Sequence, residues 1–519
     1  MIPIPFFRID GMARGLETAG SSPQFEGRFG RMFRSLSPAH FSTGALHVLA
    51  QHMTADDEGG KATPETESDD EENVGTDPKK PGISAGYTYF GQFVDHDLTF
   101  DPASSLQKAN DPDGLVDFRT PRFDLDNIYG RGPDDQPYMY EEDGVRMLLG
   151  DQLTGNSKDQ NARDVPRNSS GRAIIGDPRN DENVIVSQLQ AAFLRFHNRV
   201  ADVLGSKSFV EVQQAVRWHY QWVVINDFLK TVIGSETLHR ILPHLKSRLP
   251  LDRDRPRLSF YKPRKDSFIP VEFSVAAYRF GHSMVRPQYR LNEGTPAVEG
   301  NPDPSHQNDP RLPICGPGES LVGFRRFPRS WAVDWSLFFP MGASTDSGKG
   351  RVQPAYKIDT SLVNPLGTLP HPVIGDSITA LAERNLLRGL RMKLPSGQAV
   401  ARAMGEAVIP DVKLRVGKAN EDGDKSNPTL VSLSDEFRGN APLWYYILAE
   451  AQQNFVDNST VLRLGPVGGR IVGEVFIGLM LNDSHSYLSQ DPNWEPRSDF
   501  LNAAGEFGIA ELLGQALKA

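Results

Sequence analysis

Cysteine is almost missing from this sequence: Cys315 is the single one among 519 residues. A disulfide within the chain is therefore impossible, which excludes a small secreted domain held together by such bonds. The first residues, MIPIPFFRIDGMARGLE, lack the basic start and apolar run of a signal peptide. Residues 471–481 are the most apolar late segment, but they are few and include Glu474, so no membrane span is expected. We expect a soluble protein, cytoplasmic by default, with secretion by another route left open.

Clustered positive charge is missing as well. The formal net charge is −10 and no basic stripe stands out, so no nucleic-acid partner is expected. Walker A and HExxH patterns are absent, and SGKGR at residues 347–351 lacks the spacing of a phosphate-binding loop. A glycine-rich stretch at residues 465–470 predicts a turn and close packing ahead of a helix. Composition leaves the oligomeric state open.

Helical periodicity dominates what is present. Hydrophobic residues make up 38% of the chain, enough for a large core. Apolar residues three and four positions apart predict helices over residues 186–204, 210–233 and 442–453. Strand patterns are few, and proline and glycine over residues 292–329 favour ordered loops.

The expected fold class is therefore mainly α, with long ordered loops and little β. We expect a single large helical domain over residues 84–519. Residues 1–53 are expected to form an N-terminal segment that packs on it. Residues 54–83 are acidic and polar, and they cannot bury enough apolar surface to offset the entropy of ordering. We expect them to form a mobile surface loop.

A first polar cluster lies in GQFVDHDLTF, residues 91–100. On a helix, Gln92, Asp95 and His96 would share one face, whereas Asp97 would point away from it. Such a cluster is costly to bury unless it has a function. Taken alone, the segment is explained equally well as a solvated helix face.

A second cluster lies in GDPRNDEN, residues 176–183. Arg179 and Glu182 are three positions apart, at the start of the helix predicted from residue 186. Asp181 and Glu182 also suit a first helical turn, because carboxylates stabilise the positive end of the helix dipole. Helix capping alone would explain this segment.

Two further segments combine basic and amide side chains at helical spacing. YRFGHSMVRP, residues 278–287, would place Arg279 and His282 on one face. A histidine in an apolar helix is usually a core residue, but a neutral imidazole also suits a metal or haem iron. In residues 383–398, Asn385 and Arg388 lie three apart in a leucine-rich helix. Asn385 could be a packing residue or the acceptor that orients a ligand histidine.

Oxygen-bearing side chains alternate in RTPRFDLDNIYG, residues 119–130. Thr120, Asp124 and Asp126 at this spacing suit calcium, which takes six to eight oxygen ligands. The EF-hand pattern is absent, and aspartate-rich turns without a metal are common.

In this order, the segments resemble the animal-type haem peroxidases, the myeloperoxidase and lactoperoxidase group of the peroxidase–cyclooxygenase superfamily. The resemblance runs from about Gly86 to Leu481, and GQFVDHD and RFGH carry it most specifically. Without disulfides and a signal peptide, the chain looks like a bacterial member. The resemblance implies haem b as cofactor, residues 84–519 as the catalytic domain, and reduction of hydrogen peroxide through the compound I intermediate.

The resemblance implies a role for each polar residue named so far. In the distal pocket, His96 would be the acid and base, Arg179 its partner, and Gln92 a lining residue. On the proximal side, His282 would bind the haem iron, and Asn385 would accept the second ring N–H. The haem propionates would pair with Arg279 and Arg388, and ester bonds to the haem would involve Asp95 and Glu182. The calcium ligands would be Asp97, Thr120, Arg122 through its backbone carbonyl, Asp124 and Asp126.

Two departures from the family narrow the expected donors. Asn183 stands where myeloperoxidase has a methionine bonded to the haem, so bromide, iodide, thiocyanate and phenols are expected rather than chloride. Cyclooxygenases carry a radical tyrosine three residues before the proximal histidine, where this chain has Arg279. The alternatives left open are a haem-dependent fatty-acid dioxygenase of the same superfamily and a non-catalytic haem-binding or adhesion module.

Overall fold

The structure is a computed structural model. It describes residues 27–55, 82–99, 116–117, 121–205, 207–263, 266–292, 311–315, 319–342, 350–369, 378–420, 423–457 and 460–519. Thr120, one of the expected calcium ligands, lies outside these residues. So do most of the acidic residues 54–83, for which a mobile loop is predicted.

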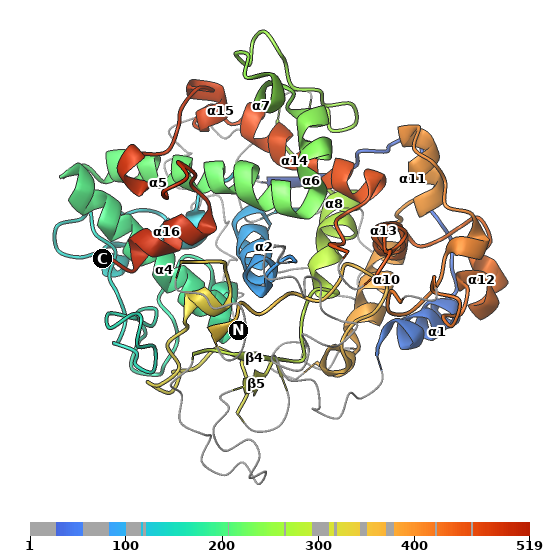
Figure 1. The fold of residues 1–519 in the computed structure, drawn as a ribbon, viewed down its shortest axis with the longest axis horizontal. Coiled ribbons are helices and arrows are strands. Elements are labelled where there is room, and N and C mark those ends of the chain that lie inside the picture. The colour runs from blue at the N-terminus through green and yellow to red at the C-terminus, as the bar shows by residue number, and fades with distance from the viewer. Residues whose placement is uncertain are drawn as a thin grey trace, which may run out of the picture.

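The described residues are mainly helical, as expected (Figure 1). The longer α-helices are α1 Thr43–Met53, α2 Ala85–Leu98, α4 Val184–Leu204, α5 Phe209–Val223, α6 Lys230–Ile241, α10 Leu381–Arg391, α11 Gly397–Met404, α13 Leu443–Gln452, α14 Pro466–Asn482 and α16 Ile509–Ala516. Single-turn helices are α3 Asp126–Tyr129, α7 His244–Ser247, α8 Val271–Ser274, α12 Leu430–Leu433 and α15 Tyr487–Gln490. Two 3-10 helices bear on the site, η6 Pro178–Asp181 and η8 Ala277–His282.

Strands are short in the described part of the chain. The strand β1 Gly27–Gly30 pairs antiparallel with β2 Val116–Asp117 and parallel with β3 Ile269–Pro270. A second pair joins β4 Gln288–Arg290 and β5 Arg311–Pro313, antiparallel. These ribbons tie loops together, and the core is formed by the helices: one buried hydrophobic cluster includes residues from Phe33 to Ala516.

The three predicted helices are present, with informative boundaries. The helix α4 begins two residues earlier than predicted, because the Asn183 side chain accepts a hydrogen bond from Ile185 N at 2.8 Å and caps it. The stretch predicted over residues 210–233 is α5 followed by a π-helical turn, Val224–Leu229, and α6. Inside α6, Gly234 has φ 78°, a conformation that favours glycine, so the helix is kinked there.

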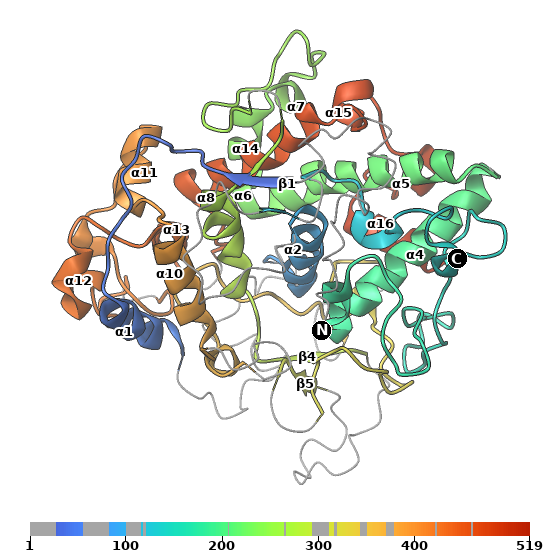
Figure 2. The same cartoon turned by 180° about the vertical axis from the view of Figure 1, so that it is seen from behind.

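The helix α2 lies near the middle of the molecule (Figures 1 and 2). The helices α4 and α5 lie to one side of it, and α8, α10 and α13 lie to the other. Direct contacts join α2 to α3, α4, η6 and η8. Phe93 on α2 stacks on Phe193 of α4, with ring centroids 4.6 Å apart. The described segments with predicted site residues therefore lie close together. Each packs on α2 or on an element that contacts α2.

Candidate active site

His96 lies in the last turn of α2 and is 4% exposed. Its Nε2 is 3.5 Å from Oε1 of Glu182. Gln92, one turn earlier, donates from Nε2 to the same Glu182 oxygen. The structure therefore brings Gln92, His96 and Glu182 together, although Glu182 comes from the loop that precedes α4.

The other ring nitrogen of His96 contacts a residue that sequence reasoning missed. Nδ1 lies 2.7 Å from Oδ1 of Asn180. Asn180 in turn donates from Nδ2 to Oε1 of Gln190 on α4 at 2.7 Å. The available signal was Gln190 itself, a polar residue at a fully buried position of an apolar helix face.

Arg179 also contacts the end of α2, through backbone atoms. Its Nη2 donates to His96 O at 3.2 Å and to Thr99 O, which are carbonyls left without a helical partner where α2 ends. Asp177, fully buried, accepts from Arg179 Nη2 at 2.8 Å. Arg179 thus joins the loop before α4 to the helix that carries His96.

A buried ion pair fixes the 3-10 helix η6. Arg167 donates to Asp181 at 2.6 and 2.7 Å and to Asp164 at 2.7 Å, and its guanidinium lies 4.7 Å from the Phe327 ring centroid. This pairing corrects the expected capping role of Asp181, because Asn183 caps α4 and Asp181 binds Arg167 instead. Arg179 and Glu182 likewise lie on and just after η6, ahead of α4 rather than within its first turn.

His282 ends η8, which packs on α2, α13 and α14. A 3-10 helix has three residues per turn, so Arg279 and His282 share a face as expected. Burial and then the guanidinium of Arg279 lower the pKa of His282 to about 3. The ring is therefore neutral at physiological pH, and among the described residues nothing hydrogen-bonds to its Nε2. A neutral imidazole with an available Nε2 suits haem iron.

Asn385, on α10, contacts His282 as expected, but with the other end of its amide. Its Nδ2 is 2.7 Å from His282 Nδ1. Its Oδ1 accepts from Arg279 Nη1 at 2.8 Å. A guanidinium can only donate, and here that of Arg279 is bonded to the amide oxygen. That Asn385 accepts the ring N–H when haem is bound stays a prediction.

Basic side chains gather beside Arg279. Burial lowers the pKa of Arg279, and the Asp95 carboxylate of α2 raises it. The guanidinium groups of Arg388 and Arg384 lower it further. Three guanidinium groups close to one carboxylate make a site suited to an anionic ligand group such as a haem propionate. Asp95 itself accepts a hydrogen bond from Thr99 Oγ1 at 3.2 Å.

The helix α13 packs against η8, the 3-10 helix that carries Arg279 and His282. Trp444 donates from Nε1 to Arg279 O at 3.2 Å. Glu450, on the same helix, accepts from the first peptide groups of α14, Val467 N at 2.9 Å and Gly468 N at 3.2 Å. A Cβ on Gly465 would lie 2.4 Å from Glu450 Cγ, so the predicted close packing of the glycine-rich stretch is confirmed. Burial raises the pKa of Glu450 to about 7, although those peptide N–H groups lower it.

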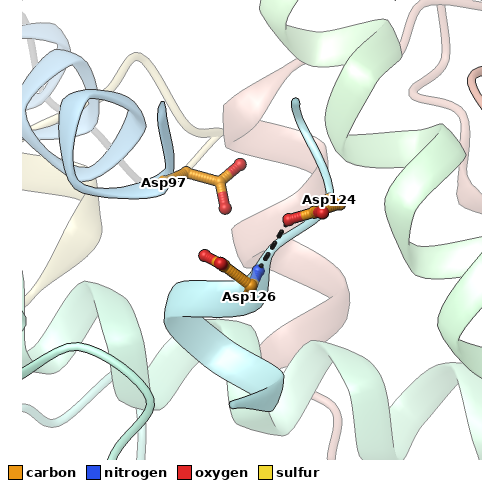
Figure 3. Close-up of side chains that lie close together, drawn as sticks. All are labelled: Asp97, Asp124 and Asp126. Carbon is orange, nitrogen blue, oxygen red and sulfur yellow. Dashed lines mark hydrogen bonds between the residues drawn. The ribbon is translucent and has the colours of Figure 1, made fainter. Parts of the chain in front are cut away.

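Three aspartates form an acidic cluster at the other side of α2 (Figure 3). Asp97 points from the end of α2 toward Asp124 and Asp126, and carboxylate oxygens of all three lie within 4.8 Å of one another. Asp126 begins α3, and its backbone N donates to Asp124 Oδ1 at 3.1 Å. Carboxylate oxygens gathered in this way are the ligands that calcium prefers.

Residues 106–312 match the model of the family described as animal haem peroxidase. The matched part is less than half of the chain. The matched residues include Arg179, Glu182 and His282, whereas His96 and Asn385 lie outside them. These two residues nevertheless contact Glu182 and His282 in the structure.

Similar proteins carry related names. A peroxidase-like protein from Margaritifera margaritifera is 35% identical over 121 residues, 21% of this chain and 14% of that protein. The chain therefore matches only a small part of that relative's length. In the described part of the chain, every helix is too short or too polar to cross a membrane.

Solved structures share the helical fold over most of the chain. Peroxidase A from Dictyostelium discoideum has a TM-score of 0.53 at 15% identity, covering 91% of this chain and 92% of that one. A fatty acid alpha-dioxygenase from Arabidopsis thaliana has a TM-score of 0.55 at 16% identity, covering 95% of this chain and 76% of that one. Both likenesses describe the helical architecture alone.

Proposed function

We propose that the chain is a haem peroxidase that reduces hydrogen peroxide and oxidises small donors, namely bromide, iodide, thiocyanate or phenols. The observation that carries the proposal is a neutral, partly buried His282 with an available Nε2, on a helix that packs against the helix of His96. The family match and the peroxidase name of the first relative support it.

The residues present fit haem b. His282 would bind the iron through Nε2, and Arg279 and Arg388 would pair with the propionates. The two anionic propionates, together with the Asp95 carboxylate, would balance the charge of the three neighbouring guanidinium groups. Asp95 and Glu182 are the candidates for ester bonds to the porphyrin. The haem would supply the iron and the porphyrin that hold the oxidising equivalents of peroxide.

The protein would handle the protons. One oxygen of hydrogen peroxide would remain at the haem and must lose its proton. The other oxygen gains a proton and leaves as water. His96 Nε2 would take the first proton and return it to the leaving oxygen. Arg179 would stabilise the negative charge that develops between the oxygens, and Gln92 would line the same pocket.

Calcium would bind Asp97, Asp124 and Asp126, with Thr120 and the carbonyl of Arg122 completing the set. Asp97 is the residue after His96. A calcium ion there would hold the last turn of α2, and with it the position of the distal histidine.

Fatty-acid oxygenation is the second candidate, because the likeness to the plant alpha-dioxygenase covers 95% of the chain. The residues of η8 argue against fatty-acid oxygenation. Arg279 occupies the place of the radical tyrosine, and Tyr278 is packed between Phe273 and Phe476, donating to Gly91 O at 3.1 Å.

The test is a visible absorption spectrum of the haem-loaded protein during titration with hydrogen peroxide. We expect the Soret band to lose intensity with peroxide and to recover with bromide, iodide, thiocyanate or a phenol. Oxygen consumption with a long-chain fatty acid, without donor turnover, would favour the dioxygenase. If the haem reacts with neither hydrogen peroxide nor the fatty acid, the protein would be a non-catalytic haem-binding module.

Ester formation has its own measurement. After peroxide treatment, acid and organic solvent should fail to extract the haem from the wild-type protein. Glu182→Gln and Asp95→Asn should each release more of it, and the double variant should release all. Complete extraction from the treated wild-type protein would exclude the ester bonds while leaving the peroxidase proposal standing.

A further inference from the structure

His96 and two buried amides, those of Asn180 and Gln190, form one row of hydrogen bonds. Asn180 and Gln190 are fully buried, and His96 is 4% exposed. His96 Nδ1 to Asn180 Oδ1 is 2.7 Å, and Asn180 Nδ2 to Gln190 Oε1 is 2.7 Å. The three residues come from α2, η6 and α4, so these hydrogen bonds connect three elements around one imidazole.

The orientation of the two amides favours hydrogen on Nδ1 of His96, although the Glu182 carboxylate lies 3.5 Å from Nε2. The side-chain oxygen of Gln190 can only accept, so it receives the Nδ2 hydrogen of Asn180. The amide of Asn180 then presents Oδ1, a pure acceptor, to His96 Nδ1. That contact is a hydrogen bond only when Nδ1 bears hydrogen, which leaves the lone pair of the neutral ring on Nε2.

Two other groups hold Asn180 in register with the ring. Its neighbour Asp181 is bound to Arg167, whose guanidinium is buried against Phe327. Its neighbour Arg179 is bound to Asp177 and to His96 O. The backbone on both sides of Asn180 is thereby fixed, and the amide is aimed at the ring.

We propose that Asn180 is a positioning residue for the distal histidine: it keeps the proton of His96 on Nδ1, so that Nε2 is the atom that exchanges protons with the substrate. The mechanistic part of this inference rests on the proposed peroxidase function. A ring that carried its hydrogen on Nε2 could not accept the first proton of peroxide at the nitrogen that faces Glu182.

The first experiment measures the tautomer directly in the full chain before haem is added. Two-dimensional proton–nitrogen spectra of the protein labelled with ¹⁵N-histidine distinguish a protonated from an unprotonated ring nitrogen. His96→Gln identifies the signal. We expect the neutral His96 ring to carry hydrogen on Nδ1. A ring with hydrogen on Nε2 overturns the proposal, and this measurement requires no substitution at Asn180.

The second experiment compares three variants. Asn180→Leu removes the acceptor at similar volume, and we expect the His96 ring to shift toward the Nε2–H tautomer. Asn180→Asp keeps an oxygen opposite Nδ1, and it should keep hydrogen there. Asn156→Leu is the matched control, because Asn156 is buried and hydrogen-bonded to Val333 O and Lys158 N, away from His96. An unchanged tautomer in Asn180→Leu overturns the proposal.

The third experiment uses the haem-loaded protein and stopped-flow mixing with hydrogen peroxide. Asn180→Leu should react roughly 10- to 100-fold more slowly, the range seen when a group that orients a functional histidine is lost. Asn180→Asp should recover most of the rate. A full rate in Asn180→Leu overturns the positioning role. If no variant, the wild type included, reacts with peroxide, the proposed function fails while the tautomer measurement still decides the role of Asn180.

Discussion

The two histidines of the candidate site have the same type of neighbour and are held in opposite ways. Each has an asparagine amide 2.7 Å from its Nδ1. For His96 the contact atom is the oxygen of Asn180, and for His282 it is the nitrogen of Asn385. A third residue makes the difference: Gln190 takes the nitrogen of Asn180, whereas Arg279 takes the oxygen of Asn385.

The comparison teaches that an asparagine beside a histidine does not by itself set a tautomer. The oxygen of Gln190 accepts from Asn180 and leaves its oxygen to the ring, whereas the guanidinium of Arg279, which can only donate, takes the oxygen of Asn385. On the distal side the arrangement matches a proton acceptor. On the proximal side, the proposed iron binding through Nε2 would need hydrogen on Nδ1, so Asn385 would have to turn and Arg279 to release its oxygen.

Replacing each histidine should break the comparison most strongly. His282→Ala removes the proposed iron ligand, so the variant should lose stable haem binding. His96→Ala should keep the haem and react with peroxide 10²- to 10⁴-fold more slowly, the usual contribution of a general acid and base. The haem Soret band after gel filtration and stopped-flow kinetics measure these effects. Wild-type peroxide kinetics in His96→Ala would make the distal assignment wrong.

Removing the guanidinium of Arg279 should make the two histidines alike. In the haem-free wild type we expect hydrogen on Nε2 of His282 and on Nδ1 of His96, visible in one spectrum of the ¹⁵N-histidine-labelled chain. In Arg279→Met the oxygen of Asn385 is free to face the ring, and His282 should change to the Nδ1–H tautomer. The His96 signal serves as the internal control. A His282 ring that already carries hydrogen on Nδ1 in the wild type would contradict the orientation of Asn385.

The free energy of unfolding should depend on pH through Glu450, which lies on α13 and contacts the start of α14. Its folded pKa of about 7 lies above its ordinary value, so its contribution to stability is present in acid and is lost as pH rises through about 7. Between about pH 4.5 and 8 this change amounts to about 3 kcal/mol. Glu450→Gln should remove that dependence in urea unfolding, whereas Glu211→Gln, exposed on α5, should leave it. Parallel pH profiles of wild type and Glu450→Gln would contradict the prediction.

Calcium should stabilise the distal side selectively. At 100 times its dissociation constant the ion should add about 2.7 kcal/mol to the free energy of unfolding, raising the melting temperature. Asp124→Asn and Asp126→Asn should abolish this gain, and Asp135→Asn, a half-exposed carboxylate, should retain it. Calcium should also shift the ring signals of His96 and leave those of His282 in place. Equal shifts in both rings would show that the ion acts on the whole protein.

The fold could be predicted from the sequence where one apolar helix face is continuous. This holds for α4 and α13, whose buried residues recur at helical spacing. The break after α5 was not predicted, since the π-helical turn over Val224–Leu229 keeps an apolar pattern. Asp227 in this turn makes tertiary hydrogen bonds: it accepts from Tyr87 on α2 and from Ile509 N on α16.

The candidate site was predicted as a set of residues, through the family resemblance, but not as a network. His282 and Asn385 lie in contact, as that resemblance implied. The contact of His96 with Glu182 was not part of that expectation. Asn180 and Gln190 were missed because a hydrogen bond between polar residues ten positions apart leaves no periodic signal. The orientation of Asn385 was missed for a different reason: it depends on Arg279, 106 residues away in the chain.

The π-helical turn has a consequence for how the molecule assembles. Asp227 binds the start of α16, 282 residues later in the chain, and also Tyr87 on the helix of the distal histidine. Contacts between residues so far apart form late, because the loop they close is long. During synthesis on the ribosome, the helix of His96 would gain its last anchor only after α16 had emerged. Ribosome-bound chains stopped before residue 509 should therefore expose α2 to proteases that spare the released protein.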